Sequence, residues 1–185
     1  IDQFFYEDNG KKYMFWGSFR GIYATELTDN GLEIKKKTDG TPVLKKRICG
    51  NRFEGTNIYK RGEYYYLFAS IGTCCNGATS TYQTVVGRSK NVLGPYLDKT
   101  GRDMLYDYCE IIMSGNETWA GPGHNSILIQ DDVGTDWIIY HGYKKKEAEN
   151  GRYVLMDKLI WSNDGWPSVK SNAPSILEVA PYFQK

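Results

Sequence analysis

The chain has 185 residues, of which 41% are hydrophobic, and its 23 basic and 22 acidic side chains give a formal net charge of +1. This composition excludes a disordered chain and predicts a soluble globular protein of one or two domains. A charge balance near zero gives no electrostatic reason to expect nucleic acid or an anionic membrane as a partner. No apolar run approaches the roughly 18 residues of a membrane-spanning helix.

The chain opens with a predicted β-hairpin whose strands are rich in aromatic residues, as pleated and half-buried strands are. Its strands are expected at 2–6 and 13–18, joined by a turn at 7–10. Two further strands are predicted at 21–27 and 32–34, on either side of a turn containing Gly31.

The same hairpin pattern occurs twice more. Its second copy begins at Glu54, with strands at 57–59 and 64–68 around a turn at 60–63, and its third begins at His124, with strands at 124–129 and 137–140 around a turn at 131–134. Glu54 is separated from Gly62 by the same number of residues as Asp2 is from Gly10. No amphipathic helix of useful length is visible, so the predicted class is all-β.

Repeats of short strands at such periods are typical of solenoids and propellers. We therefore predict one β-propeller portion with blade-like repeats at about 1–48, 49–120 and 121–170 and a C-terminal tail at 171–185. In a propeller the first strand of each blade lines the central channel, so Asp2, Glu54 and His124 are expected to converge on one axis. The alternative is that three hydrophilic residues merely precede three strands.

The second repeat contains a polar, glycine-rich loop at 71–82, which is the kind of segment that builds a substrate-binding face on a rigid scaffold. An ordinary connection is the alternative. Within it, Cys74 and Cys75 are adjacent, and we expect two small buried thiols rather than a disulfide between neighbours. A bridge between Cys49 and Cys109 stays open, and the cysteine spacing lacks the pairs that are typical of structural zinc.

Several stretches, taken in this order, resemble glycoside hydrolase family 43, most closely its endo-acting arabinanases. They are Ile1–Asp2 with the hairpin to Ser18, Phe53–Gly55, Cys74–Cys75 with Gly77, Ser80–Tyr82, Val86–Ser89, Gly94–Tyr96 with Asp98, Gly121–Asn125 and Asp164–Pro167. The resemblance implies a five-bladed β-propeller, of which this chain would supply the last three blades. It also implies an inverting glycoside hydrolase whose substrate is arabinan or an arabino-oligosaccharide.

Residue by residue, the resemblance makes Glu54 the general acid and Asp2 the neighbouring carboxylate that orients it and raises its pKa. It places His124 near a bound metal ion, usually calcium. Cys75, Ser80 and Tyr82 would contact the substrate. These roles suit the chemistry, since inversion needs a protonated carboxyl group beside the leaving oxygen and a carboxylate base across the sugar ring.

The chain departs from the family pattern at three places. Gln3 follows the aspartate where proline is usual, and 107–110 replaces an expected glycine-rich segment. The general base belongs to the family's first blade, and no residue here matches it. We therefore expect a truncated or processed product that is inactive alone and associates with a complementary N-terminal propeller fragment or with itself. We also expect a secreted or periplasmic protein, although no signal peptide is visible.

Two other functions fit the same sequence. One is a noncatalytic carbohydrate-binding propeller fragment, which would need the same blades. The other is an exo-acting arabinofuranosidase or β-xylosidase, against which the loop with Cys74–Cys75 and Ser80–Tyr82 argues.

Overall fold

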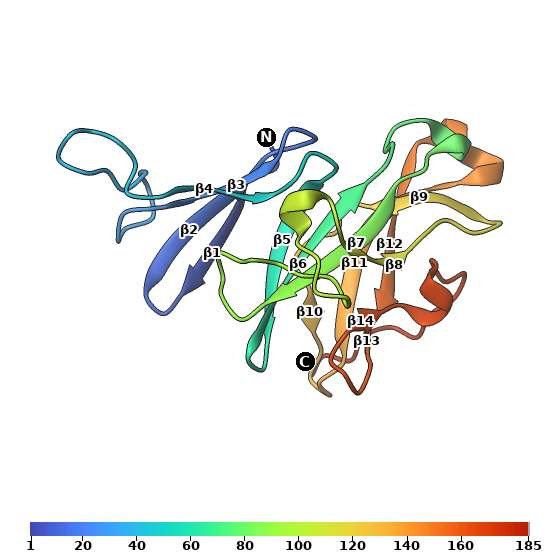
Figure 1. Cartoon of the computed structure of the whole chain (residues 1–185). Coiled ribbons are helices and arrows are strands. Elements are labelled where there is room, and N and C mark those ends of the chain that lie inside the picture. Colours follow the sequence, from blue (N-terminus) through green and yellow to red (C-terminus); the bar gives the residue numbers. More distant parts are fainter. Residues whose placement is uncertain (185) are drawn as a thin grey trace. The chain divides into compact units, whose positions relative to one another are not determined.

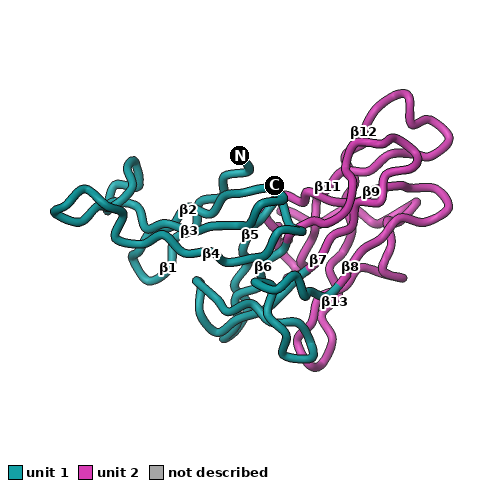
Figure 2. The backbone as a smooth tube through the Cα atoms, turned by 45° about the horizontal axis from the view of Figure 1, so that its top comes forward, with its two compact units in different colours: residues 1–68, 86–110 teal, residues 69–85, 111–185 magenta. Residues whose placement is uncertain are grey.

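The computed structural model describes residues 1–184. The chain forms two compact units (Figure 2), of which unit 1 comprises residues 1–68 and 86–110 and unit 2 comprises residues 69–85 and those from 111 onward. Regular structure is almost entirely antiparallel strand, which confirms the all-β prediction. None of the helices in the described part of the chain is long and apolar enough to cross a membrane.

The first sheet belongs to unit 1 and begins with the predicted hairpin. Its four strands lie side by side in chain order (Figure 1): β1 (Phe4–Asp8), β2 (Lys11–Trp16), β3 (Ile22–Glu26) and β4 (Lys45–Cys49). Asn9 and Gly10, both with positive φ, form the two-residue turn between β1 and β2. Such turns match the twist of a hairpin, and an Asn-Gly pair favours them.

The predicted fourth strand at 32–34 is wrong, because β4 is formed by Lys45–Cys49 instead. Residues 32–34 make only an isolated bridge between Leu27 and Ile34. Leu32 is 83% exposed, so this segment has little apolar surface to bury against the sheet. The turn containing Gly31 is present, but it leads into a loop rather than into the sheet.

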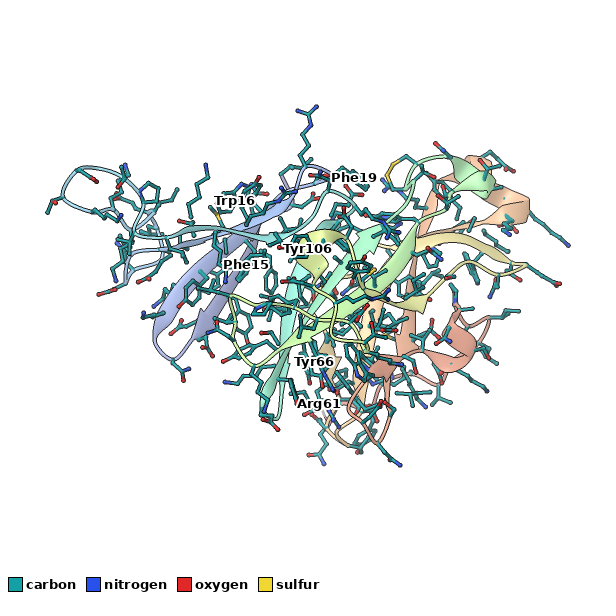
Figure 3. All side chains as sticks on the ribbon, in the orientation of Figure 1. Phe15, Trp16, Phe19, Arg61, Tyr66 and Tyr106 are labelled. Atoms are coloured by element: carbon teal, nitrogen blue, oxygen red, sulfur yellow. A yellow bond between two sulfur atoms is a disulfide. The ribbon has the colours of Figure 1, made fainter. Side chains whose placement is uncertain are left out.

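The second sheet has the order β5 (Glu54–Arg61), β6 (Tyr64–Ile71), β7 (Gln83–Ser89), β8 (Glu110–Met113), and the boundary between the two units crosses it. The predicted turn at 60–63 is confirmed, with Gly62 at positive φ. In unit 1 the largest fully buried side chains are Phe15, Ile22, Phe53, Tyr66, Leu67, Phe68, Tyr96 and Met104; Figure 3 labels Phe15 and Tyr66.

The third sheet lies in unit 2 and contains β9 (Trp119–Gly123), β10 (Ile129–Gln130), β11 (Asp136–Lys144) and β12 (Arg152–Lys158). β12 pairs along β11, while β9 and β10 pair with its two ends. A two-stranded sheet of β13 (Ile160–Trp161) and β14 (Pro167–Ser168) follows. Tyr82, Met113, Trp137 and Ile138 are fully buried in unit 2.

The predicted strand at 124–129 is wrong for residues 124–128, which belong to no strand, while the preceding residues 119–123 form β9. His124 has φ +50°, which is incompatible with extended backbone and interrupts the strand. The segment stays beside β11 because the Ser126 N–H donates to the Ile139 carbonyl (2.8 Å).

Four short 3₁₀ helices complete the described part of the chain. They are η1 (Gly77–Thr79), η2 (Met104–Tyr106), η3 (Lys145–Asn150) and η4 (Lys170–Asn172). The division into blade-like repeats at 1–48, 49–120 and 121–170 stays a prediction.

Candidate active site

Asp2 and Glu54 come together in unit 1, at the start of β5. An Asp2 Oδ2 atom accepts a hydrogen bond from the Gly55 N–H, 3.3 Å away, and Gly55 directly follows Glu54. Glu54 is buried, with 8% of its surface exposed. A buried carboxyl group with a second carboxylate at the next peptide is a typical arrangement of acid–base sites.

Ser18, which the sequence did not mark as a site residue, contacts Glu54 directly. Its Oγ donates to Glu54 Oε2 over 2.7 Å. The loop that carries Ser18 is fixed to the same strand, since the Phe19 N–H donates to the Phe53 carbonyl (2.9 Å). Ser18 lies two residues beyond β2, which ends at Trp16, and the signal that could have found it was its place at the end of the predicted strand at 13–18.

His124 lies in unit 2, where its exposed side chain is anchored through its backbone. The His124 N–H donates to the fully buried Ser70 Oγ over 2.7 Å. The His124 ring stacks on the His141 ring, with centroids 6.2 Å apart and planes 26° apart. His124 belongs to the other unit from Asp2 and Glu54, and its convergence with them stays a prediction.

His141, the second histidine of the chain, is another site residue that sequence reasoning missed. Its ring lies between those of His124 and Tyr82, and the Tyr82 centroid is 5.8 Å from it at an interplanar angle of 16°. The register of β11 on β9 places His141 opposite Gly123. Glycine is required there, because a Cβ atom would come within 2.4 Å of the Tyr82 ring. Because the chain has only two histidines, each could have been tested as a site residue.

The loop at 71–82 lies in unit 2 beside these rings and is closed by hydrogen bonds between two threonines. The Thr73 and Thr81 hydroxyl groups are 2.9 Å apart, and each accepts from the other residue's backbone N–H. Ser80 is nearly buried, and its Oγ accepts from the Asn76 N–H (2.9 Å). Tyr82 is buried, whereas Cys75 is exposed on the loop.

The expectation of buried thiols at Cys74 and Cys75 is wrong, because these two residues form a disulfide. The physical reason is their location, since the loop provides no apolar interior in which two thiols could be buried. Cys49 and Cys109 are free, so the bridge between them is not formed.

Around His124 the donors do not make a calcium site by themselves. Calcium prefers six to eight oxygen ligands, whereas the groups here are two imidazole rings and the Ser70 hydroxyl, which the His124 N–H already uses. Within residues 1–184, no three His, Cys, Asp or Glu residues are grouped closely enough to hold a metal ion. His124 could supply one ligand at most.

Comparison with known proteins identifies a family. The profile described as glycosyl hydrolases family 43 matches residues 1–167. An extracellular exo-α-(1→5)-L-arabinofuranosidase of Cellvibrio japonicus is 36% identical over 88% of this chain and 49% of its own length. An extracellular endo-α-(1→5)-L-arabinanase of Bacillus subtilis is 35% identical over 88% of this chain and 48% of its own. The chain thus spans about half the length of these relatives.

Comparison with solved structures also identifies arabinanases as similar proteins. The α-L-arabinanase of Cellvibrio cellulosa, complexed with arabinohexaose, matches with a TM-score of 0.76 and 34% identity, over 92% of this chain and 57% of that one. An exo-1,5-α-L-arabinanase from a bovine ruminal metagenomic library matches with a TM-score of 0.79 and 36% identity, over 92% and 56%. The fold is that of a five-bladed β-propeller, of which this chain forms a part.

Proposed function

The chain belongs to glycosyl hydrolases family 43, and we propose that it is the part of an inverting hydrolase that supplies the general acid for cleaving α-1,5-linked arabinan. The observation that carries the proposal is the pairing of Asp2 with the peptide after Glu54. Relatives named as arabinanases and an arabinofuranosidase support the substrate class.

Glu54 is the proposed proton donor to the leaving oxygen. The Ser18 hydroxyl donates to Glu54 Oε2 over 2.7 Å and so fixes the orientation of the carboxyl group that is proposed to deliver the proton. General acid catalysis of this kind contributes about 10²- to 10⁴-fold in rate, provided that the acid is held within hydrogen-bond reach of the leaving group.

Asp2 acts as a positioning residue in this proposal. Its carboxylate accepts the Gly55 N–H and so fixes the backbone that carries Glu54. Asp2 does not fit the role of the general base. An inverting base must lie across the sugar ring from the acid, with the carboxyl groups about 6.5 to 9.5 Å apart so that water fits between. Asp2 instead binds the peptide adjacent to the acid.

The general base is therefore proposed to come from a segment outside this chain, which corresponds to the half of the relatives that it does not match. A complementary N-terminal propeller fragment is the expected partner, with self-association as the alternative. Relatives named extracellular and the Cys74–Cys75 disulfide support a secreted or periplasmic location.

The sugar is proposed to bind on the loop that carries Cys75, Ser80 and Tyr82. The disulfide there is an exposed, apolar group, and Tyr82 supports the stack under His141 and His124. Calcium near His124 stays a proposal that rests on the family resemblance. Water would have to supply most of its ligands, and calorimetric titration of the chain with CaCl₂ tests it, with no heat counting against it.

Exo-acting hydrolysis is the second candidate, because two of the similar proteins are named exo-acting and are 36% identical. The products distinguish the two modes, since an exo-enzyme releases one short product from the first turnover whereas an endo-enzyme releases a range of lengths. A noncatalytic carbohydrate-binding fragment is the remaining alternative, and it would bind arabino-oligosaccharides with no turnover in any combination.

The test combines the 185-residue chain with the N-terminal half of the Cellvibrio japonicus relative and follows hydrolysis of linear α-1,5-arabinan. We expect no turnover by the chain alone, turnover by the pair, and loss of about 10²- to 10⁴-fold with Glu54→Gln. Proton NMR of the first product should show the inverted anomer. Turnover by the chain alone would refute the external base. An inactive pair that still binds arabinohexaose would favour the noncatalytic module.

A further inference from the structure

Two adjoining cavities open on unit 1, and both include Lys90 and Asn91 in their walls. We call them together the basic groove. The larger has a volume of about 510 Å³, and its lining includes Tyr64, Arg88, Pro95, Leu97 and Lys99. The smaller has a volume of about 390 Å³, and its lining includes Asp8, Lys11 and Tyr65. Volumes of this size are typical of ligand sites, and two cavities in a row suit an extended ligand.

The basic groove is far from the general acid. Glu54 begins β5, whereas Tyr64 follows the turn at the other end of that strand. Eight extended residues span roughly 23 to 27 Å. Figure 3 shows the same separation within unit 1, with Phe19 beside the start of β5 and Arg61 at its far end. A ligand in this groove would therefore be separate from the sugar cleaved at Glu54.

The lining carries an excess of positive charge. Lys11, Arg88, Lys90 and Lys99 line the groove, while its acidic groups are Asp8 and Asp98. Both carboxylates are bound by cations from outside the lining. Lys60 Nζ lies 3.4 Å from Asp8, and Arg102 Nε donates to Asp98 over 2.8 Å. The groove is consequently an electropositive surface on a chain whose net charge is only +1.

Tyr64 holds two of these cations in place. The Arg88 guanidinium carbon is 4.6 Å from the centre of the Tyr64 ring, and Lys90 Nζ is 5.5 Å from it. Cation–π contacts of this kind fix a long side chain without neutralising it. Lys90 Nζ also forms an ion pair with Glu63 over 2.7 Å, and both side chains are exposed. An exposed ion pair is weak enough for a ligand carboxylate to replace Glu63.

The backbone that presents Lys99 is rigid. Asp98 Oδ1 accepts from the N–H groups of Thr100 and Arg102, at 2.8 and 2.9 Å, and closes the turn around Lys99. A second part of the lining is fixed by two hydrogen bonds between the backbones of Arg88 and Leu97, both of 2.9 Å. Because this backbone is already ordered before a ligand binds, binding does not cost the conformational entropy of ordering it.

We propose that the basic groove binds an oligosaccharide that carries carboxylate groups, that is, a chain containing uronic acids. Separate cations suit one carboxylate per sugar, and an Arg fork matches a carboxylate with two parallel hydrogen bonds. The side chains of Pro95 and Leu97 offer apolar surface to the C–H faces of the rings. A nucleic acid, with its denser charge, fits less well, because the chain as a whole has almost no net positive charge to attract it. This inference does not depend on hydrolysis at Glu54.

The test is calorimetric titration of the 185-residue chain with tetragalacturonate, beside a neutral galactotetraose of the same length. We expect binding of the uronate alone, with an affinity that falls as salt is added. The double variant Lys90→Gln/Lys99→Gln should weaken it by about tenfold, because two cations are lost. The matched control, Lys36→Gln/Lys37→Gln, makes the same charge change at exposed lysines outside the groove and should alter the affinity less than about twofold.

Three outcomes would overturn the proposal. They are no binding of tetragalacturonate at millimolar concentration, equal binding of the neutral tetrasaccharide, and an equal effect of the two double variants. Tighter binding of a single-stranded DNA decamer would also overturn it and assign the groove to nucleic acid. None of these results would bear on arabinan hydrolysis, which Glu54→Gln tests separately.

Discussion

Asp2 and His124, which open two of the hairpin copies predicted from the sequence, share an unusual backbone conformation, with φ of 56° and 50°. The left-handed region costs a non-glycine residue roughly 1–2 kcal/mol. Strain of this kind persists where the surrounding structure imposes it, and it is concentrated at functional sites. Neither residue belongs to a strand, and each has a backbone conformation that extended residues do not adopt.

This strain predicts an inverted order of stability at position 124. His124→Ala and His124→Gly both lose the stack on His141, but only glycine adopts φ +50° without strain. We expect the glycine variant to be more stable than the alanine variant by about 1 kcal/mol. Urea unfolding of the two variants measures the difference. An alanine variant equal to or more stable than the glycine variant would contradict a strained backbone.

Ser18 predicts a defect in turnover rather than in binding. Ser18→Ala removes the donor to Glu54 Oε2 without touching the proposed sugar-binding loop. A hydrogen bond to a charged group contributes about 1.5–3 kcal/mol, so we expect kcat of the reconstituted enzyme to fall by roughly tenfold or more, with KM little changed. Ser18→Thr, which keeps the hydroxyl, should restore most of the rate. A rise in KM alone, or no rescue by threonine, would point to a merely structural role.

The proximity of Asp2 to Glu54 could be predicted from the sequence because each residue opens a copy of the predicted hairpin pattern. The structure brings Asp2 to the Gly55 N–H, next to Glu54. His141 could not be predicted in this way. It reaches His124 only because β11 pairs with β9 opposite Gly123, and the strand at 119–123 has no clear periodicity.

Two other errors have physical causes that pattern reasoning does not detect. The segment at 124–129 is predicted as a strand because it opens the third copy of the hairpin pattern, yet the left-handed backbone of His124 keeps residues 124–128 out of a strand. The segment at 32–34 has strand-forming residues but makes only an isolated bridge to Leu27, while Lys45–Cys49 pairs along β3. Disulfides between neighbouring cysteines are rare, which favours free thiols at Cys74 and Cys75, but this general rarity says nothing about one particular exposed loop.

The cysteines predict a definite thiol count and an unusual pH dependence. Unfolded, unreduced protein should react with Ellman's reagent at two thiols, Cys49 and Cys109, and at four after reduction. In the folded protein, burial raises the pKa of Cys109 to about 11, and burial with the nearby Asp103 carboxylate raises that of Cys49 well above its usual range. Only the thiolate reacts. The rate for native Cys109 should therefore keep rising above pH 9, where an ordinary thiol levels off.

Two results would contradict these predictions for the cysteines. Four thiols in unreduced, unfolded protein would mean that Cys74 and Cys75 are not bridged. A native reaction rate that levels off near pH 9 would mean that the Cys109 thiol is not shielded from water. The double variant Cys74→Ser/Cys75→Ser is the control, since it should leave the count at two with or without reductant.

Asp131 anchors the C-terminal tail and predicts a loss of stability in acid. Its carboxylate accepts hydrogen bonds from the Thr135 N–H (2.8 Å), the Trp137 indole N–H (3.0 Å) and the Tyr182 N–H (3.3 Å). Burial by itself would raise the pKa of Asp131, but these hydrogen bonds outweigh it and lower the pKa below its ordinary value. Such a carboxylate stabilises the folded state above its unfolded-state pKa, and the contribution disappears as the pH falls through the folded-state pKa.

Asp131→Asn tests this directly, because the amide keeps the shape but not the charge. At pH 7 we expect the variant to unfold at a lower urea concentration than the original chain. The difference should shrink as the pH is lowered below 4, because the original carboxyl group then becomes protonated and loses the same charge. Asp132→Asn is the matched control. The Asp132 carboxylate accepts a hydrogen bond from the Gln184 N–H, so this variant should show a smaller difference at pH 7 than one that removes the three hydrogen bonds of Asp131. A difference for Asp131→Asn that stays constant from pH 7 to pH 3 would show that the turn depends on the shape of the side chain and not on its ionisation.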